Sequence, residues 1–194
     1  MDASADLYKE DDNRLVARFK NGDISAFNRL VIKYQKKLYS VVYKIILDHD
    51  ETNDVLQDVF IKVYNSISSF REESGFYTWI YRITVNMTLN RIKKLKSAKL
   101  TRIEEINVPT ADEKNISETT DNNSKLQFLR YAVSRLPEQQ RIVFCLRQYE
   151  GLSYQEISVI TGKSIGGLKA NYFHAFAKIS EIMKNKFNEN EQHK

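Results

Sequence analysis

The scarcity of glycine and proline most constrains the fold of this chain, which has 6 glycines and 2 prolines among 194 residues. Sandwiches and barrels of many short strands need frequent turns, and glycine and proline supply the backbone angles of those turns. Long stretches without either residue, rich in leucine, isoleucine, lysine and glutamate, are typical of helices instead. We therefore predict an all-α protein.

Charge is distributed unevenly along the chain and divides it into three parts. Residues 1–96 carry 16 Lys and Arg against 13 Asp and Glu, residues 97–123 carry 3 against 6, and residues 124–194 carry 11 against 6. The middle part has no aromatic residue and no apolar periodicity, which is typical of a linker. We predict two small helical domains, residues 1–96 and 124–194, joined by a polar linker over residues 97–123.

A basic stretch without acidic residues runs from Ser74 to Ile103 in the sequence. A solvated helix normally mixes charges of both signs, so this stretch indicates a surface that binds phosphate groups. A lysine-rich face that only keeps a helix hydrated is the alternative interpretation. The stretch contains seven basic side chains, namely Arg82, Arg91, Lys93, Lys94, Lys96, Lys99 and Arg102.

Apolar periodicity and capping residues predict three helices in the first domain. The first follows a capping Asp23 and continues to residue 45, the second begins at Asp50 or Thr52, and the third covers about residues 78–96. Three amphipathic helices suffice for a small bundle.

Five aromatic residues lie just before and at the start of the third predicted helix. Aromatic rings beside a basic helix can stack on unpaired bases. The alternative, which spacing alone favours, is that they fill the core, and we expect Trp79 in particular to point inward. The five are Phe70, Phe76, Tyr77, Trp79 and Tyr81.

The last domain contains the signals of a helix-turn-helix. Pro137 opens one helix, Ser153 and Glu156 have the spacing of a capping box, and Gly162 ends the short helix that follows. Ser164 caps a second, more basic helix, as in proteins that place such a helix in the major groove of DNA. An ordinary corner between two helices is the alternative. The buried face of the second helix should comprise Leu168, Tyr172, Ala175, Phe176, Ile179 and Ile182.

The sequence offers little for catalysis, cofactors or metals. The single cysteine, Cys145, lies among apolar residues, the three histidines are scattered, and there is no glycine-rich phosphate loop. The first 20 residues lack the apolar run of a signal peptide, and no stretch approaches 18 apolar residues. We expect a cytoplasmic, non-enzymatic protein that does not insert into membranes and needs no cofactor.

Three sequence blocks, in their order, resemble bacterial RNA polymerase sigma factors of the extracytoplasmic-function group of the sigma-70 family. DVLQDVFIKVYNSISSF at residues 54–70 resembles the family's polymerase-binding helix, and FREESGFYTWIYRITVN at residues 70–86 resembles its minus-ten region. LPEQQRIVFCLRQYEGLSYQEISVITGKSIGGLKANYFHAFAKI at residues 136–179 resembles its minus-thirty-five domain. The resemblance covers roughly residues 20–185.

The resemblance implies a protein that binds core RNA polymerase, recognises promoter DNA and promotes strand opening, held in check by an anti-sigma factor. It assigns contact with the largest polymerase subunits to Asp54, Gln57 and Asp58. It assigns the minus-ten element to Ser74, Gly75, Phe76, Tyr77, Thr78, Arg82, Asn86, Arg91, Lys93 and Lys94, and the minus-thirty-five element to Lys163, Ser164, Gly167, Lys169, Asn171 and His174. The alternative is a stand-alone helix-turn-helix regulator that binds duplex DNA without polymerase.

The recognition helix departs from the family's usual pattern. Arginines are common where this chain has Asn171 and His174, so we expect weaker phosphate binding at this end. An asparagine amide can pair bidentately with adenine, which favours an altered minus-thirty-five preference. Lys169, Asn171 and His174 are the expected readers.

Overall fold

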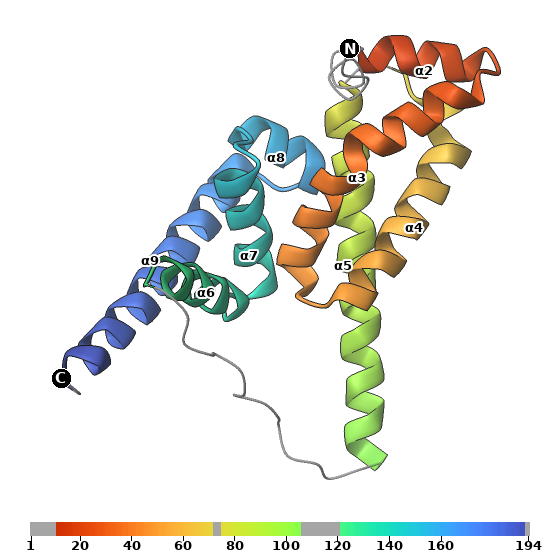
Figure 1. Ribbon diagram of the computed structural model, residues 1–194. Helices are drawn as coiled ribbons and strands as arrows, with labels where there is room; N and C mark the ends of the chain where they lie inside the picture. The colour runs from red at the N-terminus through yellow and green to blue at the C-terminus, as the bar shows by residue number, and fades with distance from the viewer. Residues whose placement is uncertain (1–10, 72–74, 106–120, 193–194) are drawn as a thin grey trace. The chain divides into compact units, whose positions relative to one another are not determined.

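The computed structural model describes residues 11–71, 75–105 and 121–192, with side chains placed only within residues 11–71, 75–98 and 127–185. Every regular element in these ranges is helical, which confirms the predicted all-α class (Figure 1). The chain divides into two compact units, Met1–Ile92 with Ser158–Gly162, and Lys93–Ile157 with Lys163–Lys194. In the described residues no helix is long and apolar enough to cross a membrane.

The N-terminal helices form a bundle in which α3 packs against both α2 and α4 (Figure 1). The buried side chains recur at intervals of three and four residues, as expected for helices that share a core. Removing one large apolar side chain from water contributes about 1.5–3 kcal/mol to folding. The elements are α2 (Asp12–Lys20), α3 (Ile24–Ile46), α4 (His49–Ser66), the short 3-10 turn η1 (Ile67–Ser69) and α5 (Phe76–Glu105).

Side-chain caps define where α3 and α4 begin. The Asp23 carboxylate accepts a 3.0 Å hydrogen bond from the backbone N–H of Ser25, which confirms its predicted capping role. Asp48 accepts a 2.9 Å bond from the N–H of Glu51, so α4 begins at His49, slightly before the predicted start. Each cap satisfies a donor that a helix N-terminus would otherwise leave without a partner.

Helix α5 is longer than the predicted helix over residues 78–96, because it runs from Phe76 to Glu105. No glycine or proline occurs between these two residues, so nothing in the sequence breaks the helix. The predicted linker over residues 97–123 therefore begins as helix, and its central residues 106–120 lie outside the described ranges. The domain bounds at residues 96 and 124 stay a prediction.

The C-terminal helices assemble around α9, against which α6 and α7 pack. Pro137 directly precedes α7, and a φ of 68° at Gly151 turns the chain toward α8. The buried apolar side chains include Leu146, Ile157 and Leu168. The elements are α6 (Asp121–Ser134), α7 (Glu138–Phe144), the π-helical turn η2 (Cys145–Tyr149), α8 (Tyr154–Thr161) and α9 (Ile165–Gln192).

The predicted capping box and glycine turn are both present around α8. Ser153 N–H donates to the Glu156 carboxylate at 2.7 Å, and Glu156 N–H donates to Ser153 Oγ at 3.2 Å. This pairing lowers the pKa of Glu156, chiefly through the Ser153 hydroxyl. Gly162 has a φ of 69°, a left-handed conformation that favours glycine, and Ser164 Oγ caps α9 by accepting from Gly167 N–H at 3.2 Å.

One part of the predicted buried face of α9 is wrong. Leu168, Ala175 and Ile179 are buried, but the side chain of Phe176 is 59% exposed. Consecutive helical residues are about 100° apart, so Phe176 is turned away from the side on which Ala175 is buried. Phe173, with 70% of its surface exposed, also points outward.

Candidate nucleic-acid and protein interfaces

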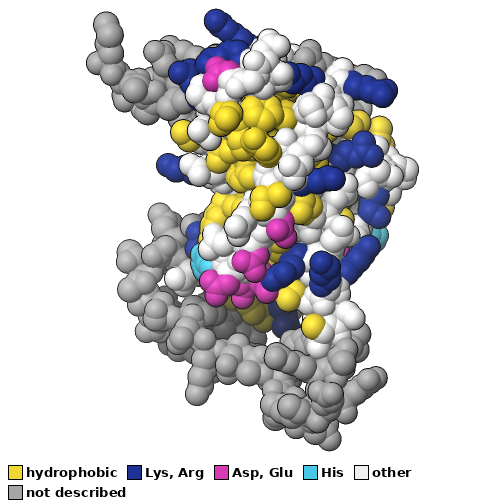
Figure 2. Space-filling view, turned by 90° about the vertical axis from the view of Figure 1, so that its right-hand side faces the viewer, with side chains coloured by type: hydrophobic (Ala, Val, Ile, Leu, Met, Phe, Trp, Pro, Cys, Tyr) yellow, Lys and Arg dark blue, Asp and Glu magenta, His cyan; other side chains and the backbone are white. Residues whose placement is uncertain are grey.

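The outer side of α4 presents the residues to which the resemblance assigns polymerase contact. Asp54, Gln57 and Asp58 are exposed, whereas the neighbouring Val55 and Val59 are buried in the bundle. Figure 2 looks onto this side of the molecule and shows a group of acidic side chains with basic and hydrophobic surface beside it. The three residues therefore form one accessible polar face.

A shallow groove of about 660 Å³ lies along the same face, between α3 and α4. Gln57 belongs to its wall, so the groove and the polar face are continuous. Apolar and aromatic side chains supply much of the remaining surface, which suits a protein partner better than a small charged ligand. The lining residues are Val31, Gln35, Lys36, Tyr39, Asn53, Leu56, Gln57 and Phe60.

Basic and polar side chains of α5 form a second candidate surface. Arg82, Asn86 and Lys93 are exposed, and their spacings of four and seven residues place them on one side of the helix. Lys94 is also exposed, one position further around. Because acidic residues are absent from residues 75–98, this face can lie along a phosphate backbone.

Arg91 does not share that face. Its guanidinium Nη2 donates a 3.0 Å hydrogen bond to Asp54 Oδ2, and its Nε pairs with Glu51. The Glu51 hydrogen bond is the main reason that the pKa of Arg91 is raised further above its ordinary value. The structure thus joins a residue assigned to DNA with one assigned to the polymerase.

The aromatic residues just before and within the first turns of α5 mostly form a packed cluster. Phe76 is 1% exposed, and its ring centre lies 5.6 Å from that of Tyr34, 5.8 Å from Phe70 and 5.6 Å from Trp79. The expectation that Phe76 offers its ring to a base does not hold for this conformation, because neighbouring rings occupy its surroundings. Trp79 is half-buried in this cluster, in line with its expected inward direction.

The remaining residues assigned to base capture are more accessible. Gly75 is exposed, whereas Tyr77 and Thr78 are half-buried. The Tyr77 ring stacks at 4.3 Å on the buried ring of Tyr81, which holds it at the beginning of α5. Ser74 lies outside the described residues.

The start of α9 carries the residues assigned to the minus-thirty-five element. Lys163, Ser164, Gly167, Lys169 and His174 are exposed on it or just before it. The Lys169 ammonium lies 5.9 Å from the ring centre of Tyr154 in α8, a cation–π distance that links the two helices.

Asn171 is less accessible than the other residues assigned to the minus-thirty-five element, which are exposed. Its side chain is half-buried, and its Nδ2 donates a 2.8 Å hydrogen bond to the backbone oxygen of Gly167. This internal bond uses one of the two N–H donors of the amide and restricts the orientation in which the amide can meet a base.

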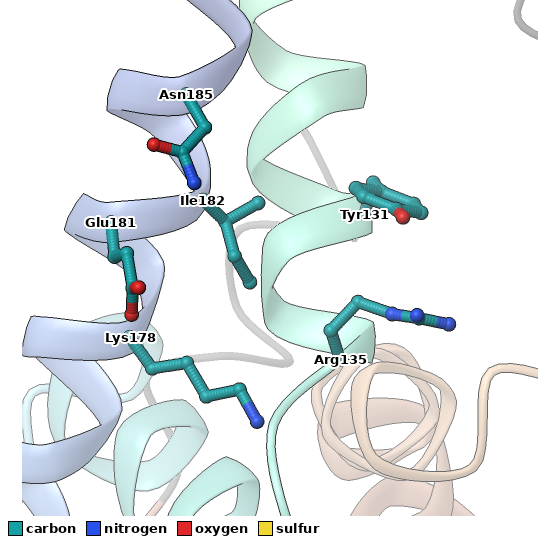
Figure 3. A pocket seen from close by; sticks show the side chains of 6 residues that line it. All are labelled: Tyr131, Arg135, Lys178, Glu181, Ile182 and Asn185. Atoms are coloured by element: carbon teal, nitrogen blue, oxygen red, sulfur yellow. The ribbon is translucent and has the colours of Figure 1, made fainter.

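A second groove, of about 490 Å³, lies between α6 and α9 (Figure 3). Tyr131 of α6 and Arg135, which directly follows that helix, contribute from one side, and the Arg135 guanidinium lies 5.8 Å from the Tyr131 ring centre. Lys178, Glu181, Ile182 and Asn185 of α9 line the opposite side. Among the described residues no group of three or more metal-ligating side chains comes together.

Two family models match this chain and cover both candidate surfaces. Sigma-70 region 2 matches residues 30–98, which include α4 and the basic face of α5. Sigma-70 region 4 matches residues 127–179, which include the helix-turn-helix. The order of the two matches is the order of the predicted domains.

Full-length relatives show the same relationship. The RNA polymerase sigma-H factor of Pseudomonas aeruginosa is 31% identical over 91% of this chain and 96% of its own length. The ECF RNA polymerase sigma-E factor of Escherichia coli K12 is 37% identical over 84% of this chain and 90% of its own length.

Solved structures share the fold. The sigma factor RpoE of Bartonella quintana, in complex with the anti-sigma factor NepR, has a TM-score of 0.65 and 22% identity, with 81% of this chain and 96% of that chain covered. CnrH, in complex with the cytosolic domain of CnrY, has a TM-score of 0.65 and 20% identity over 90% of this chain and 97% of that chain. With both regions matched in order and relatives aligned over nearly their full length, the chain belongs to the extracytoplasmic-function sigma factors of the sigma-70 family.

Proposed function

We propose that this protein binds core RNA polymerase through the exposed face of α4 and directs it to promoters through α5 and α9. As a sigma factor it is a transcription initiation factor and not an enzyme, and family membership supports this function over that of a stand-alone regulator. The assignment of polymerase binding to α4 and of strand binding to α5 rests on one observation: α4 has an acidic exposed face, and α5 has a separate basic exposed face. We place its action in the cytoplasm, where polymerase works.

The basic face of α5 is proposed to follow the opened minus-ten strand. Arg82, Asn86, Lys93 and Lys94 would hold the strand through phosphate contacts. Taking a base out of the stack costs a few kcal/mol of free energy. A pocket must offset this cost through favourable contacts with the extruded base. Residues 74–78 are the proposed pocket, with Tyr77 rather than Phe76 as the aromatic surface, because Phe76 is buried in the core.

The start of α9 is proposed to read the minus-thirty-five duplex from the major groove. Lys163, Ser164, Gly167 and Lys169 would contact the backbone and base edges, with Asn171 and His174 completing the set. If Asn171 pairs with adenine, Asn171→Ala should relax the preference at one position by roughly tenfold, as expected from about 1–3 kcal/mol for a bidentate pair. Transcription from a library of minus-thirty-five sequences measures this, and an unchanged preference would exclude Asn171 as a reader.

We also propose that an anti-sigma factor regulates the protein. The support is the fold that it shares with RpoE and CnrH, each solved in complex with the partner named above. Such a partner could occupy the groove between α6 and α9 or the groove between α3 and α4.

In vitro transcription tests the main proposal. The full chain is mixed with core polymerase and a promoter pool, and promoter-dependent transcripts are expected only when both proteins are present. A stand-alone regulator would instead bind its duplex site tightly without polymerase and yield no new transcript, which would overturn the proposal.

A further inference from the structure

Arg91 is the basic residue of α5 whose position departs from the proposed path of the DNA strand. It follows Arg82 by nine residues, which is about two and a half helical turns, so the two side chains leave the helix on opposite sides. The strand-facing residues Asn86 and Lys93 are on the side of Arg82. A DNA strand held by those residues would therefore make no contact with Arg91.

The side chain of Arg91 instead reaches the first turns of α4. It bridges Glu51 and Asp54, which lie three residues apart on one side of that helix. The side chains of Arg91 and Glu51 are 32% and 22% exposed, whereas that of Asp54 is 61% exposed. Asp54 is thus anchored on one side and open to a partner on the other.

The ion pairs of Arg91 also reduce the electrostatic repulsion between acidic side chains on α4. Glu51, Asp54 and Asp58 are spaced by three and four residues, and like charges at these spacings repel one another. The planar guanidinium can hold two carboxylates at once, which a lysine ammonium cannot do with the same geometry. Arg91 therefore compensates the charge of α4 where the polymerase-binding face begins.

We propose that Arg91 is a positioning residue of the polymerase-binding face, and that it fixes the carboxylate of Asp54 for contact with core polymerase instead of contacting the minus-ten strand. The inference rests on the proposed role of α4. Under this proposal the two opposite faces of α5 have different roles. Arg82 faces the DNA strand, and Arg91 faces α4 and supports the polymerase-binding face.

The test measures two affinities for the full chain: that for core polymerase, and that of the assembled holoenzyme for a minus-ten single strand. Arg91→Ala should weaken core binding by roughly fivefold or more, the size expected for a well-formed ion pair, and leave strand affinity unchanged. Arg91→Lys should fall between wild type and Arg91→Ala. In an Asp54→Asn background, Arg91→Ala should have little further effect, because the carboxylate that it positions is gone.

Two matched variants separate positioning from a general loss of charge. Lys37→Ala removes one positive charge from an exposed position of α3 that has no assigned role, and should bind core polymerase and the strand as wild type does. Arg82→Ala removes one positive charge from the opposite face of α5 and should lower the affinity of the holoenzyme for the strand. Thermal unfolding of each variant shows that it is folded, and Arg91→Lys provides the measurement if Arg91→Ala is not.

Three results would overturn the inference. They are unchanged core affinity in Arg91→Ala, reduced strand affinity in Arg91→Ala, or full additivity of the Arg91 and Asp54 substitutions. Failure of the wild-type chain to bind core polymerase would be a different result, because it would contradict the proposed function itself.

Discussion

The ammonium of Lys20 donates a 2.7 Å hydrogen bond to the backbone oxygen of Phe70 and lies 5.9 Å from the centre of that residue's ring. Lys20 is the last residue of α2, and Phe70 precedes the loop that leads into α5. The Phe70 ring in turn packs 5.1 Å from Trp79. Helix α2 thereby supports Phe70 and, through it, Trp79 at the start of α5, next to the residues to which we assign base capture.

Lys20→Met tests this support, because methionine keeps an apolar stem but loses the donor and the charge. A hydrogen bond of this kind contributes about 1 kcal/mol, so strand opening by the holoenzyme should fall by roughly fivefold while core affinity stays the same. Fluorescence of a base analogue in the minus-ten element measures the opening. Lys37→Met is the matched control, and equal opening in both variants would contradict the prediction.

Phe76→Ala should act on stability rather than on DNA binding alone. Its ring is enclosed by other aromatic rings, so truncation should lower the free energy of unfolding by about 3–5 kcal/mol. Tyr77→Ala, at a half-buried position, should cost less and reduce strand affinity instead. Urea denaturation and strand binding distinguish the two. A Phe76→Ala variant of wild-type stability that fails to capture the base would restore the stacking role.

The helix boundaries that the sequence predicts correctly depend on neighbours close along the chain. Asp23 with Ser25, and Ser153 with Glu156, interact across two and three residues, so their spacing alone indicates a cap. The left-handed Gly162 is equally local. The resemblance likewise depends on contiguous blocks, and for that reason both candidate surfaces could be predicted before the structure.

The features that the sequence does not predict depend on distant partners. Helix α2 has only nine residues, and the burial of its Leu15 and Val16 depends on elements that pack against it, mainly α3. Arg91 and its partners Glu51 and Asp54 are separated by 40 and 37 residues, so a local pattern presents Arg91 as one more cation of a basic helix.

Asp23 makes the stability of the bundle depend on pH. The Ser25 hydroxyl, followed by Arg18, holds its pKa at about 2, below the ordinary 3.8. A carboxylate with a lowered pKa stabilises the folded state above its unfolded pKa, and this contribution is lost as the pH falls through the folded value. As the pH falls from about 4 to about 2, Asp23→Asn should therefore lose less free energy of unfolding than the wild-type protein does.

Ser25→Ala provides the second arm of that experiment. The Ser25 hydroxyl donates to Asp23 at 2.6 Å, so its removal should raise the pKa of Asp23 and shift the loss of stability to higher pH. Chemical denaturation at a series of pH values measures both variants. Identical pH profiles for wild type and Asp23→Asn would show that this carboxylate does not contribute.

Two positions of α9 should respond oppositely to truncation. Ile179 is buried and its replacement by alanine should lower the free energy of unfolding by about 2–5 kcal/mol. Phe176, only three residues earlier, is 59% exposed, and Phe176→Ala should change that free energy by no more than about 0.5 kcal/mol. Thermal or urea unfolding measures both. A large loss in Phe176→Ala would mean that this ring is covered in solution.

Phe176→Arg should add a phosphate contact to the recognition helix, since the side chain at this position of α9 points outward. The logarithm of the binding constant falls linearly with the logarithm of the salt concentration. Each phosphate that a protein neutralises makes the slope of this line more negative by about 0.9. Duplex binding by the holoenzyme should become tighter at low salt and steeper in its salt dependence. Phe176→Gln, of similar length but uncharged, is the control. An unchanged slope for the arginine variant would place residue 176 away from the DNA backbone.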